Sequence, residues 1–162
     1  MKQQKIYQFR ELTFDIPVDP STVSMQSARH SVVAGKIHSY QKATKVQTKM
    51  ELREWFSRHP EVKEKIDLAT QQGAWVRIKK LAYVFPFPAS LSGIQKQYME
   101  RHGKLHKNTK PDLADNLKKL LFDAMSGIVF YDDARICAEN QVEKYYGGEP
   151  RIILALEIEW YE

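Results

Sequence analysis

The chain has 162 residues, of which 43% are hydrophobic and 28% are charged, and its formal net charge is +5. This length predicts one domain, residues 1–162, that is large enough to bury a core, and the sequence contains no repeat, linker or low-complexity segment. No apolar run is as long as a membrane span, the first residues do not resemble a signal peptide, and the single cysteine, Cys137, excludes an internal disulfide, so we expect a cytoplasmic protein with no membrane partner.

The first part of the chain predicts strands. Residues 6–17 alternate apolar and polar side chains, which indicates a half-buried strand. Its expected inward positions are Phe9, Leu12, Phe14 and Ile16. Residues 18–31 are polar and irregular, and residues 32–40 predict a short hairpin that turns at Gly35.

Two helices and a strand are predicted next. Residues 42–58 form the first helix, and residues 61–71 form a shorter one that starts behind Pro60. The apolar face of the first helix is expected at Val46, Met50, Trp55 and Phe56. Residues 74–85 then predict a half-buried strand that Pro86 ends.

A third helix is predicted over residues 90–102. Ser90 or Ser92 is a suitable N-cap, and Gly103 ends the helix. We expect Ile94 and Tyr98 to point inward.

The last part of the chain holds a short amphipathic helix and strands. Apolar residues recur at helical spacing over residues 113–124, and Gly127 ends that helix. Residues 128–131 predict a strand, while 135–146 and 151–161 predict two strands that a hairpin turn joins. The order of these elements predicts an α+β fold, with a mixed or antiparallel sheet and helices packed on it.

Most of the excess positive charge lies in one segment. Residues 96–110 carry five basic residues and one acid, so this segment contributes +4 (five minus one). The five are Lys96, Arg101, Lys104, Lys107 and Lys110. A basic segment next to carboxylates suits an enzyme that holds phosphates and a metal ion. The alternative is a solvated loop whose lysines have no function.

Carboxylates surround the short amphipathic helix. Asp112 and Asp115 lie at its start, and the pair Asp132–Asp133 follows the strand predicted after it. Acids at both ends of such a unit can meet in space and hold a hard cation such as Mg²⁺. The alternative for Asp112 and Asp115 is an N-cap and its N3 partner, which the helix dipole favours. Asp123 lies too far along the helix from Asp115 to bind the same ion.

The residues around this helix resemble the signature of the RusA family of Holliday junction resolvases. That signature reads K-P-D-x-D-N-x-x-K-x-x-x-D-A-[LM]-x-G and is followed by an Asp-Asp pair. The matching residues are Lys110-Pro111-Asp112, Asp115-Asn116, Lys119, Asp123-Ala124-Met125, Gly127 and Asp132-Asp133. This chain has two residues, Leu113 and Ala114, where the family has one between the first two aspartates. We expect the extra residue to be absorbed at the start of the helix, with Asp112 still at the site.

The resemblance implies a RusA-like fold and a Mg²⁺-dependent endodeoxyribonuclease, with Mn²⁺ as a second candidate metal. Such an enzyme resolves Holliday (four-way) DNA junctions by paired symmetric cleavage in DNA recombination and repair. The resemblance also implies a homodimer and a bacterial or phage-infected host. Its implied metal ligands are Asp112, Asp115 and Asp133, with Lys119 as the essential base or phosphate contact. With the basic segment, the predicted DNA-binding residues are Lys104, Lys107, Lys110 and Lys119.

Two other functions remain open from the sequence. One is a structure-selective nuclease that acts on flap or branched DNA, and the other is a non-catalytic junction-binding protein. A zinc site at His102 and His106 is not expected, because Gly103 interrupts the helix between them and no cysteine or third histidine is near.

Overall fold

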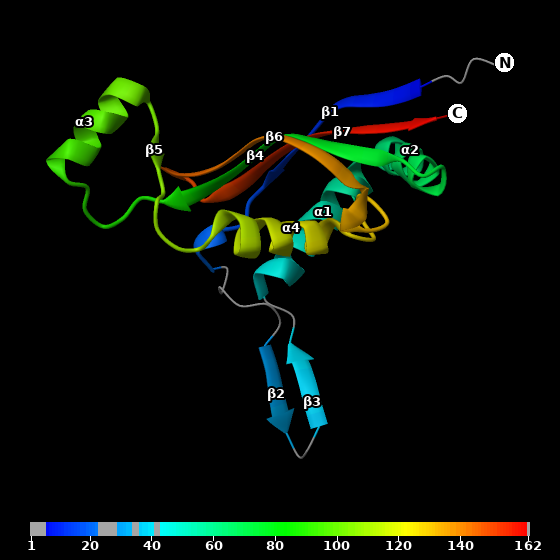
Figure 1. Cartoon of the computed structure of the whole chain (residues 1–162), viewed down its shortest axis with the longest axis horizontal. Coiled ribbons are helices and arrows are strands. Elements are labelled where there is room, and N and C mark those ends of the chain that lie inside the picture. Colours follow the sequence, from blue (N-terminus) through cyan, green and yellow to red (C-terminus); the bar gives the residue numbers. More distant parts are fainter. Residues whose placement is uncertain (1–5, 23–28, 34–35, 41–42, 162) are drawn as a thin grey trace.

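The computed structural model describes residues 6–22, 29–33, 36–40 and 43–161. Its main sheet has five strands in the order β1-β7-β4-β6-β5, in which β4 and β6 are parallel and the other neighbours are antiparallel (Figure 1). The strands are β1 Ile6–Ile16, β4 Trp75–Pro86, β5 Leu105–His106, β6 Ile136–Gly147 and β7 Arg151–Tyr161. The α+β fold with a mixed sheet is therefore confirmed.

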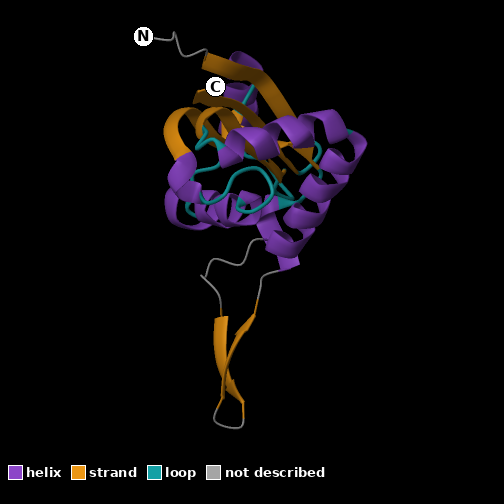
Figure 2. Cartoon of the chain, turned by 90° about the vertical axis from the view of Figure 1, so that its right-hand side faces the viewer, coloured by secondary structure: helices purple, strands orange, loops and turns teal. Residues whose placement is uncertain are grey.

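Helices cover one face of this sheet. α1 (Ala43–Arg58), α2 (Pro60–Gln71) and α4 (Lys119–Met125) contribute side chains to a single core cluster with the strands. α3 (Gly93–His102) stands beyond the edge where β5 lies (Figure 1). A second sheet consists of β2 (Arg29–Val33) and β3 (Lys36–Tyr40), which pair with each other (Figure 2). None of the helices described is long and apolar enough to cross a membrane.

The strands β1 and β7 confirm the predicted alternation. β7 buries every second residue, and β1 does the same at Leu12, Phe14 and Ile16. The buried residues of β7 are Ile152, Leu154, Leu156, Ile158 and Trp160. The side chain of Phe9 lies outside the described residues, as does the predicted turn at Gly35.

The orientation predicted for α1 is partly wrong. Val46 and Met50 are 41% and 62% exposed, whereas Leu52 and Phe56 are buried. Residues four apart share a helix face, so Leu52 and Phe56 define the buried stripe. Met50, two residues from Leu52, faces away from the core.

The inward face predicted for α3 is also wrong. Ile94 is 80% exposed and Tyr98 is 44% exposed, and α3 buries none of its residues. This helix forms because both of its ends are capped. Ser92 makes a capping box with Gln95, and Gly103 takes the left-handed conformation with φ of 70°.

Residues 128–131 do not form the predicted strand. Gly127, with φ of 79°, reverses the chain after α4, and the amide nitrogens of Ile128 and Val129 donate to the Met125 carbonyl. Ile128, Val129 and Phe130 are buried, but in a tight turn. A short apolar run has the same composition in a buried turn as in a strand, so the pattern did not distinguish them.

β6 and β7 are not the predicted hairpin, because β4 lies between them. The connection at residues 148–150 passes over the end of β4, where Val84 pairs with Tyr145 on one side and with Arg151 on the other. Gly147 lies at this crossing. A Cβ atom there would be 2.5 Å from Cγ1 of Val84, so only glycine fits without a shift.

Gly147→Ala is therefore expected to destabilise the fold by about 1–3 kcal/mol, because the new methyl group overpacks against the buried Val84. Urea unfolding measures this loss. Gly148→Ala is the matched control, since a Cβ atom at Gly148 has no neighbour within 4 Å. Equal stability of the two variants would contradict the crossing described here.

The extra residue of the acidic motif is accommodated in a π-helix. Residues Leu113–Lys118 form this helix directly before α4. The amide nitrogen of Leu117 donates to the carbonyl of Asp112, five residues back, at 3.1 Å. A π-turn holds one residue more than an α-turn, which agrees with absorption of the insertion at the start of the helix.

Candidate active site

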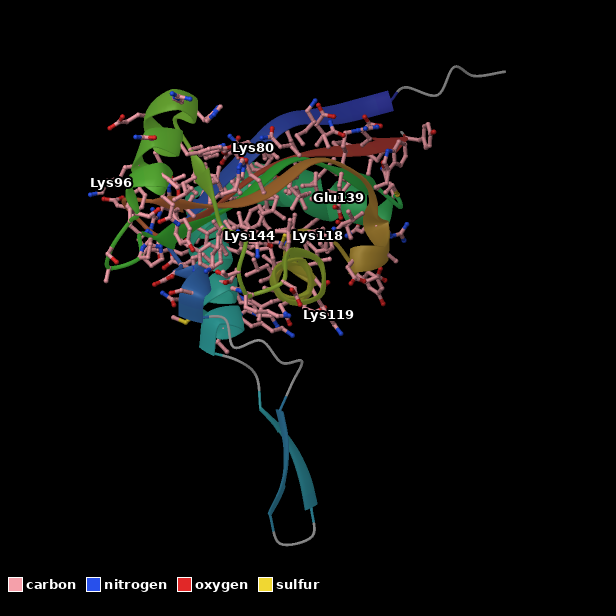
Figure 3. All side chains as sticks on the ribbon, turned by 60° about the vertical axis from the view of Figure 1, so that its left-hand side comes forward. Lys80, Lys96, Lys118, Lys119, Glu139 and Lys144 are labelled. Atoms are coloured by element: carbon pink, nitrogen blue, oxygen red, sulfur yellow. The ribbon has the colours of Figure 1, made fainter. Side chains whose placement is uncertain are left out.

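The helix of residues 113–125 runs alongside β6. At the start of the helix, Asp112 lies close enough to Lys144 of β6 for the two charges to interact. One to two turns further on, Nζ of Lys118 is 2.8 Å from Oε2 of Glu139 of the same strand (Figure 3). The loop before Asp112 and the first turns of the helix are thus held over one edge of the sheet.

Asp112 is available to a ligand. It occupies the N-cap position, but its side chain makes no capping hydrogen bond. Its Oδ2 atom is instead 2.6 Å from Nζ of Lys110, and the two side chains are 48% and 62% exposed. An exposed ion pair of this kind is worth little, so a divalent cation could displace the lysine.

Lys119 and Asp115 lie on the same part of the helix. Lys119 is exposed, and it makes no hydrogen bond or ion pair with any residue whose side chain is described. The backbone of Asp115 belongs to the π-helix, but its side chain lies outside the described part of the structure. The side chains of Asp112 and Lys119 are therefore both accessible to solvent.

The two residues of the Asp132–Asp133 pair lie in different environments. Asp132 caps a short 3-10 helix, Asp133–Arg135, and its Oδ1 atom accepts a hydrogen bond from the amide nitrogen of Ala134 at 2.9 Å. This contact gives Asp132 a structural role in the turn. Asp133 is exposed. It therefore has the accessibility that a metal ligand needs.

One chain does not bring Asp133 to Asp112. Asp112 lies near Lys144, whose partner on β4 is Tyr83, whereas Asp133 precedes Ile136, whose partner is Val76. Those two points of β6 are eight residues apart, which is about 26 Å of strand. A single ion cannot span that distance, so the predicted ligand set needs a second source for one of its members.

The described side chains provide some, but not all, of the oxygen ligands that a hard metal ion needs. Carboxylate oxygens such as those of Asp112 are the ligands that Mg²⁺ prefers. Among the side chains that the structure describes, no three acidic, histidine or cysteine residues are grouped to hold a metal. Asp112 offers one such carboxylate, and a complete metal site would need further ligands.

The basic segment is partly occupied by contacts within the chain. Lys104 lies 2.8 Å from Glu143 and 4.4 Å from the ring centroid of Tyr145, and Lys107 packs over the rings of Phe85 and Tyr146. With Lys110 bound to Asp112, three of the four lysines predicted to bind DNA have partners in the free protein. Their ammonium groups still lie along one edge of the sheet.

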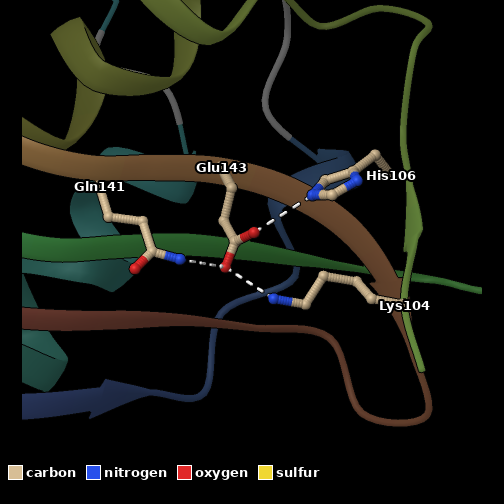
Figure 4. A network of polar contacts seen from close by, with 4 residues as sticks. All are labelled: Lys104, His106, Gln141 and Glu143. Atoms are coloured by element: carbon tan, nitrogen blue, oxygen red, sulfur yellow. Dashed lines mark hydrogen bonds and ion pairs between the residues drawn. The ribbon is translucent and has the colours of Figure 1, made fainter. Parts of the chain in front are cut away.

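A polar network ties this edge together (Figure 4). Glu143 of β6 accepts hydrogen bonds from Lys104 and Gln141 and lies 3.2 Å from a ring nitrogen of His106. Burial alone would raise the pKa of Glu143, but the hydrogen bonds and positive charges of Lys104 and His106 outweigh it and lower that pKa. The ionised Glu143 therefore stabilises β5 against β6.

Stability should consequently depend on pH through Glu143. Because its pKa is lowered in the folded state, its contribution is complete above the ordinary glutamate pKa of about 4.3. It is lost as the pH falls through the lowered value. We expect Glu143→Gln to be less stable than the wild type at pH 7, with a smaller difference in acid. Urea unfolding across pH measures this, with Glu149→Gln, in the exposed turn before β7, as the control. A difference independent of pH would contradict the network.

Lys144 and Glu143 were not among the residues predicted from the sequence. Both lie on the predicted strand 135–146, where alternating charged residues indicate only a solvated face. Their partners in residues 104–111 are 33 to 39 residues away in the chain. No local signal could have identified them.

Comparison with known proteins agrees with the resemblance noted in the sequence. The model of the family described as endodeoxyribonuclease RusA matches residues 17–157, a range that contains Asp112, Asp115, Lys119 and Asp133. An uncharacterized protein of Bacillus subtilis (strain 168), YqaN, is 35% identical over 68 residues, which are 41% of this chain and 46% of the relative. The alignment thus spans less than half of that relative. Since the family model covers most of the chain, the protein belongs to the endodeoxyribonuclease RusA family.

Proposed function

We propose that this protein is a divalent-metal-dependent endodeoxyribonuclease that resolves four-way DNA junctions by paired symmetric cleavage, in DNA recombination and repair. Membership of the RusA family carries the proposal. The exposed Asp112 and Lys119, at the start of a helix beside a basic edge, support it. The proposed setting is the cytoplasm of a bacterium or a phage-infected cell, where the DNA substrate is found.

The proposed site residues would have two roles, metal binding and phosphate contact. Asp112, Asp115 and Asp133 would hold Mg²⁺, or Mn²⁺ in its place, and Lys119 would contact the phosphate or act as the base. A bound ion would neutralise charge on the phosphate and make a water molecule more nucleophilic. Lys110 would leave Asp112 when the ion binds and join Lys104 and Lys107 on the DNA backbone.

The separation of Asp112 from Asp133 supports a homodimer as the functional unit. A two-fold axis across the middle of the helix of residues 113–125 would place the Asp112 end of one chain beside the Asp133 end of its partner. Each of the two sites would then take Asp112 and Asp115 from one chain and Asp133 from the other. Two symmetric sites match a junction with two symmetric scissile phosphates.

The test is cleavage of a synthetic four-way junction by the purified protein with Mg²⁺. We expect paired nicks at symmetric positions, and slower cleavage of a flap and of a linear duplex of the same sequence. Faster cleavage of the flap would favour a structure-selective nuclease. If the protein cleaves no junction with Mg²⁺, Mn²⁺ or Co²⁺, the proposal that it is a nuclease is wrong.

The distance between Asp112 and Asp133 in one chain is also the observation that favours a non-catalytic junction-binding protein. If this chain did not form the proposed two-fold homodimer, Asp112 and Asp133 would not meet and no complete metal site would exist. Calorimetry distinguishes the two functions. A catalytic protein binds Mg²⁺, whereas a junction-binding protein keeps its junction affinity and shows no Mg²⁺ binding.

A further inference from the structure

Lys144 makes an unusual set of contacts with the loop that precedes Asp112. From β6, its Nζ atom donates hydrogen bonds to the carbonyls of Thr109 at 2.6 Å and Pro111 at 2.7 Å. Its own carbonyl accepts a hydrogen bond from the amide nitrogen of Lys107 at 3.0 Å. One residue of the sheet thus holds residues 107–111 at three points.

An ammonium group is suited to this place. The two carbonyls belong to a loop, and a single group can satisfy both only if it carries several donors on a long stem. The position is otherwise unfavourable for a cation. Burial lowers the pKa of Lys144, and the charges of Lys107 and Lys110 lower it further, while that of Asp112 opposes them. The contacts with the loop offset these costs.

The loop that Lys144 holds leads directly into the acidic motif. Pro111 is buried, and Asp112 follows it with its carbonyl bonded to the amide nitrogen of Leu117 in the π-helix. A shift of the Thr109 and Pro111 carbonyls would therefore move Asp112 and the first turn of the helix. Lys119 lies one turn further along the same helix.

We propose that Lys144 is a positioning residue, which holds the main chain of residues 109–111 so that Asp112 is presented to a divalent cation. The proposal rests on the proposed function, because it concerns the same site. Lys144 itself touches neither the cation nor the DNA. It acts through the loop.

The test compares Lys144→Met, Lys144→Arg and Lys80→Met with the wild type. Methionine keeps the stem and removes the donors and the charge, whereas arginine keeps both. Lys80→Met is the matched control, because Lys80 lies on the neighbouring strand β4 and has no hydrogen bond or ion pair with a described residue (Figure 3). Cooperative urea unfolding of each variant checks that it folds.

The first measurement is Mn²⁺ affinity, by the loss of the free-ion paramagnetic resonance signal. We expect Lys144→Met to bind Mn²⁺ about 10- to 100-fold more weakly, the usual effect of losing a residue that orients a ligand. The direction of the change in Mn²⁺ affinity distinguishes positioning from electrostatics. Removing a nearby positive charge would by itself tighten cation binding, so weaker binding must come from lost positioning. Lys144→Arg should recover most of the affinity, and Lys80→Met should match the wild type.

The second measurement is amide hydrogen exchange without metal or DNA. Exchange at the amides of Leu117 and Lys107 should be about tenfold faster in Lys144→Met, because local opening of the loop becomes easier. Unchanged exchange, or unchanged or tighter Mn²⁺ binding, would overturn the proposal. A wild type that binds no Mn²⁺ and cuts no junction would instead overturn the proposed function, and exchange alone would then decide whether Lys144 holds the loop.

Discussion

Asp115→Asn is expected to lower the rate of junction cleavage by about a thousandfold or more, because the loss of one metal ligand removes several kcal/mol of stabilisation from the reaction. Binding of the junction should be unchanged or tighter. The substitution removes one negative charge from a surface that faces phosphates, and asparagine has nearly the same shape as aspartate. The largest effect is therefore expected on catalysis and not on affinity.

Single-turnover cleavage with Mg²⁺ measures the rate, and a gel-shift titration with Ca²⁺ in place of Mg²⁺ measures affinity. Asp123→Asn is the matched control, since it makes the same chemical change on the same helix, two turns from Asp115. Asp123 is not in the proposed ligand set and should tolerate the change. Normal cleavage by Asp115→Asn would refute the assignment of the site.

Mixed dimers of Asp115→Asn and Asp133→Asn chains are expected to regain cleavage that neither variant has alone. If each site combines Asp115 of one chain with Asp133 of the other, a mixed dimer has one site with both substitutions and one site with neither. The intact site should nick one strand of the junction. If instead each chain built its own site, both sites of the mixed dimer would be damaged.

The experiment needs co-expression of the two variants with different affinity tags and purification through both tags. Each homodimer serves as its own control and should cut at least about a hundredfold more slowly than the wild type. Single nicks by the mixed dimer, without paired cleavage, would support sites shared between chains. An inactive mixed dimer would refute them and would leave the separation of Asp112 from Asp133 unexplained.

Local features of this protein could be predicted because they depend on neighbouring residues. The alternation over 151–161 is the strand β7, and Ser92 and Gly103 cap α3 through contacts with residues within a turn. The two residues between Asp112 and Asp115 are accommodated in a π-turn, since an inserted residue must enlarge a helical turn or lie outside the helix. These features needed no information from distant parts of the chain.

Orientation and strand pairing could not be predicted in this way. α3 has the spacing of an amphipathic helix, yet Ile94 and Tyr98 are exposed and this helix buries none of its residues. The three residues between β6 and β7 would allow a hairpin, yet β4 lies between these strands. Which strand fills a gap in a sheet depends on the core of the whole domain.

The sequence by itself determined the family of this protein and its α+β class, and the motif from Lys110 to Asp133 supplied the proposed site residues. Only the tertiary structure decided how those residues are placed. The helix of residues 113–125 is about 20 Å long, and it keeps Asp112 and Asp133 at its opposite ends. Lys144 reaches the loop before Asp112 from a strand more than 30 residues away, through main-chain carbonyls that every residue possesses and that no sequence pattern distinguishes.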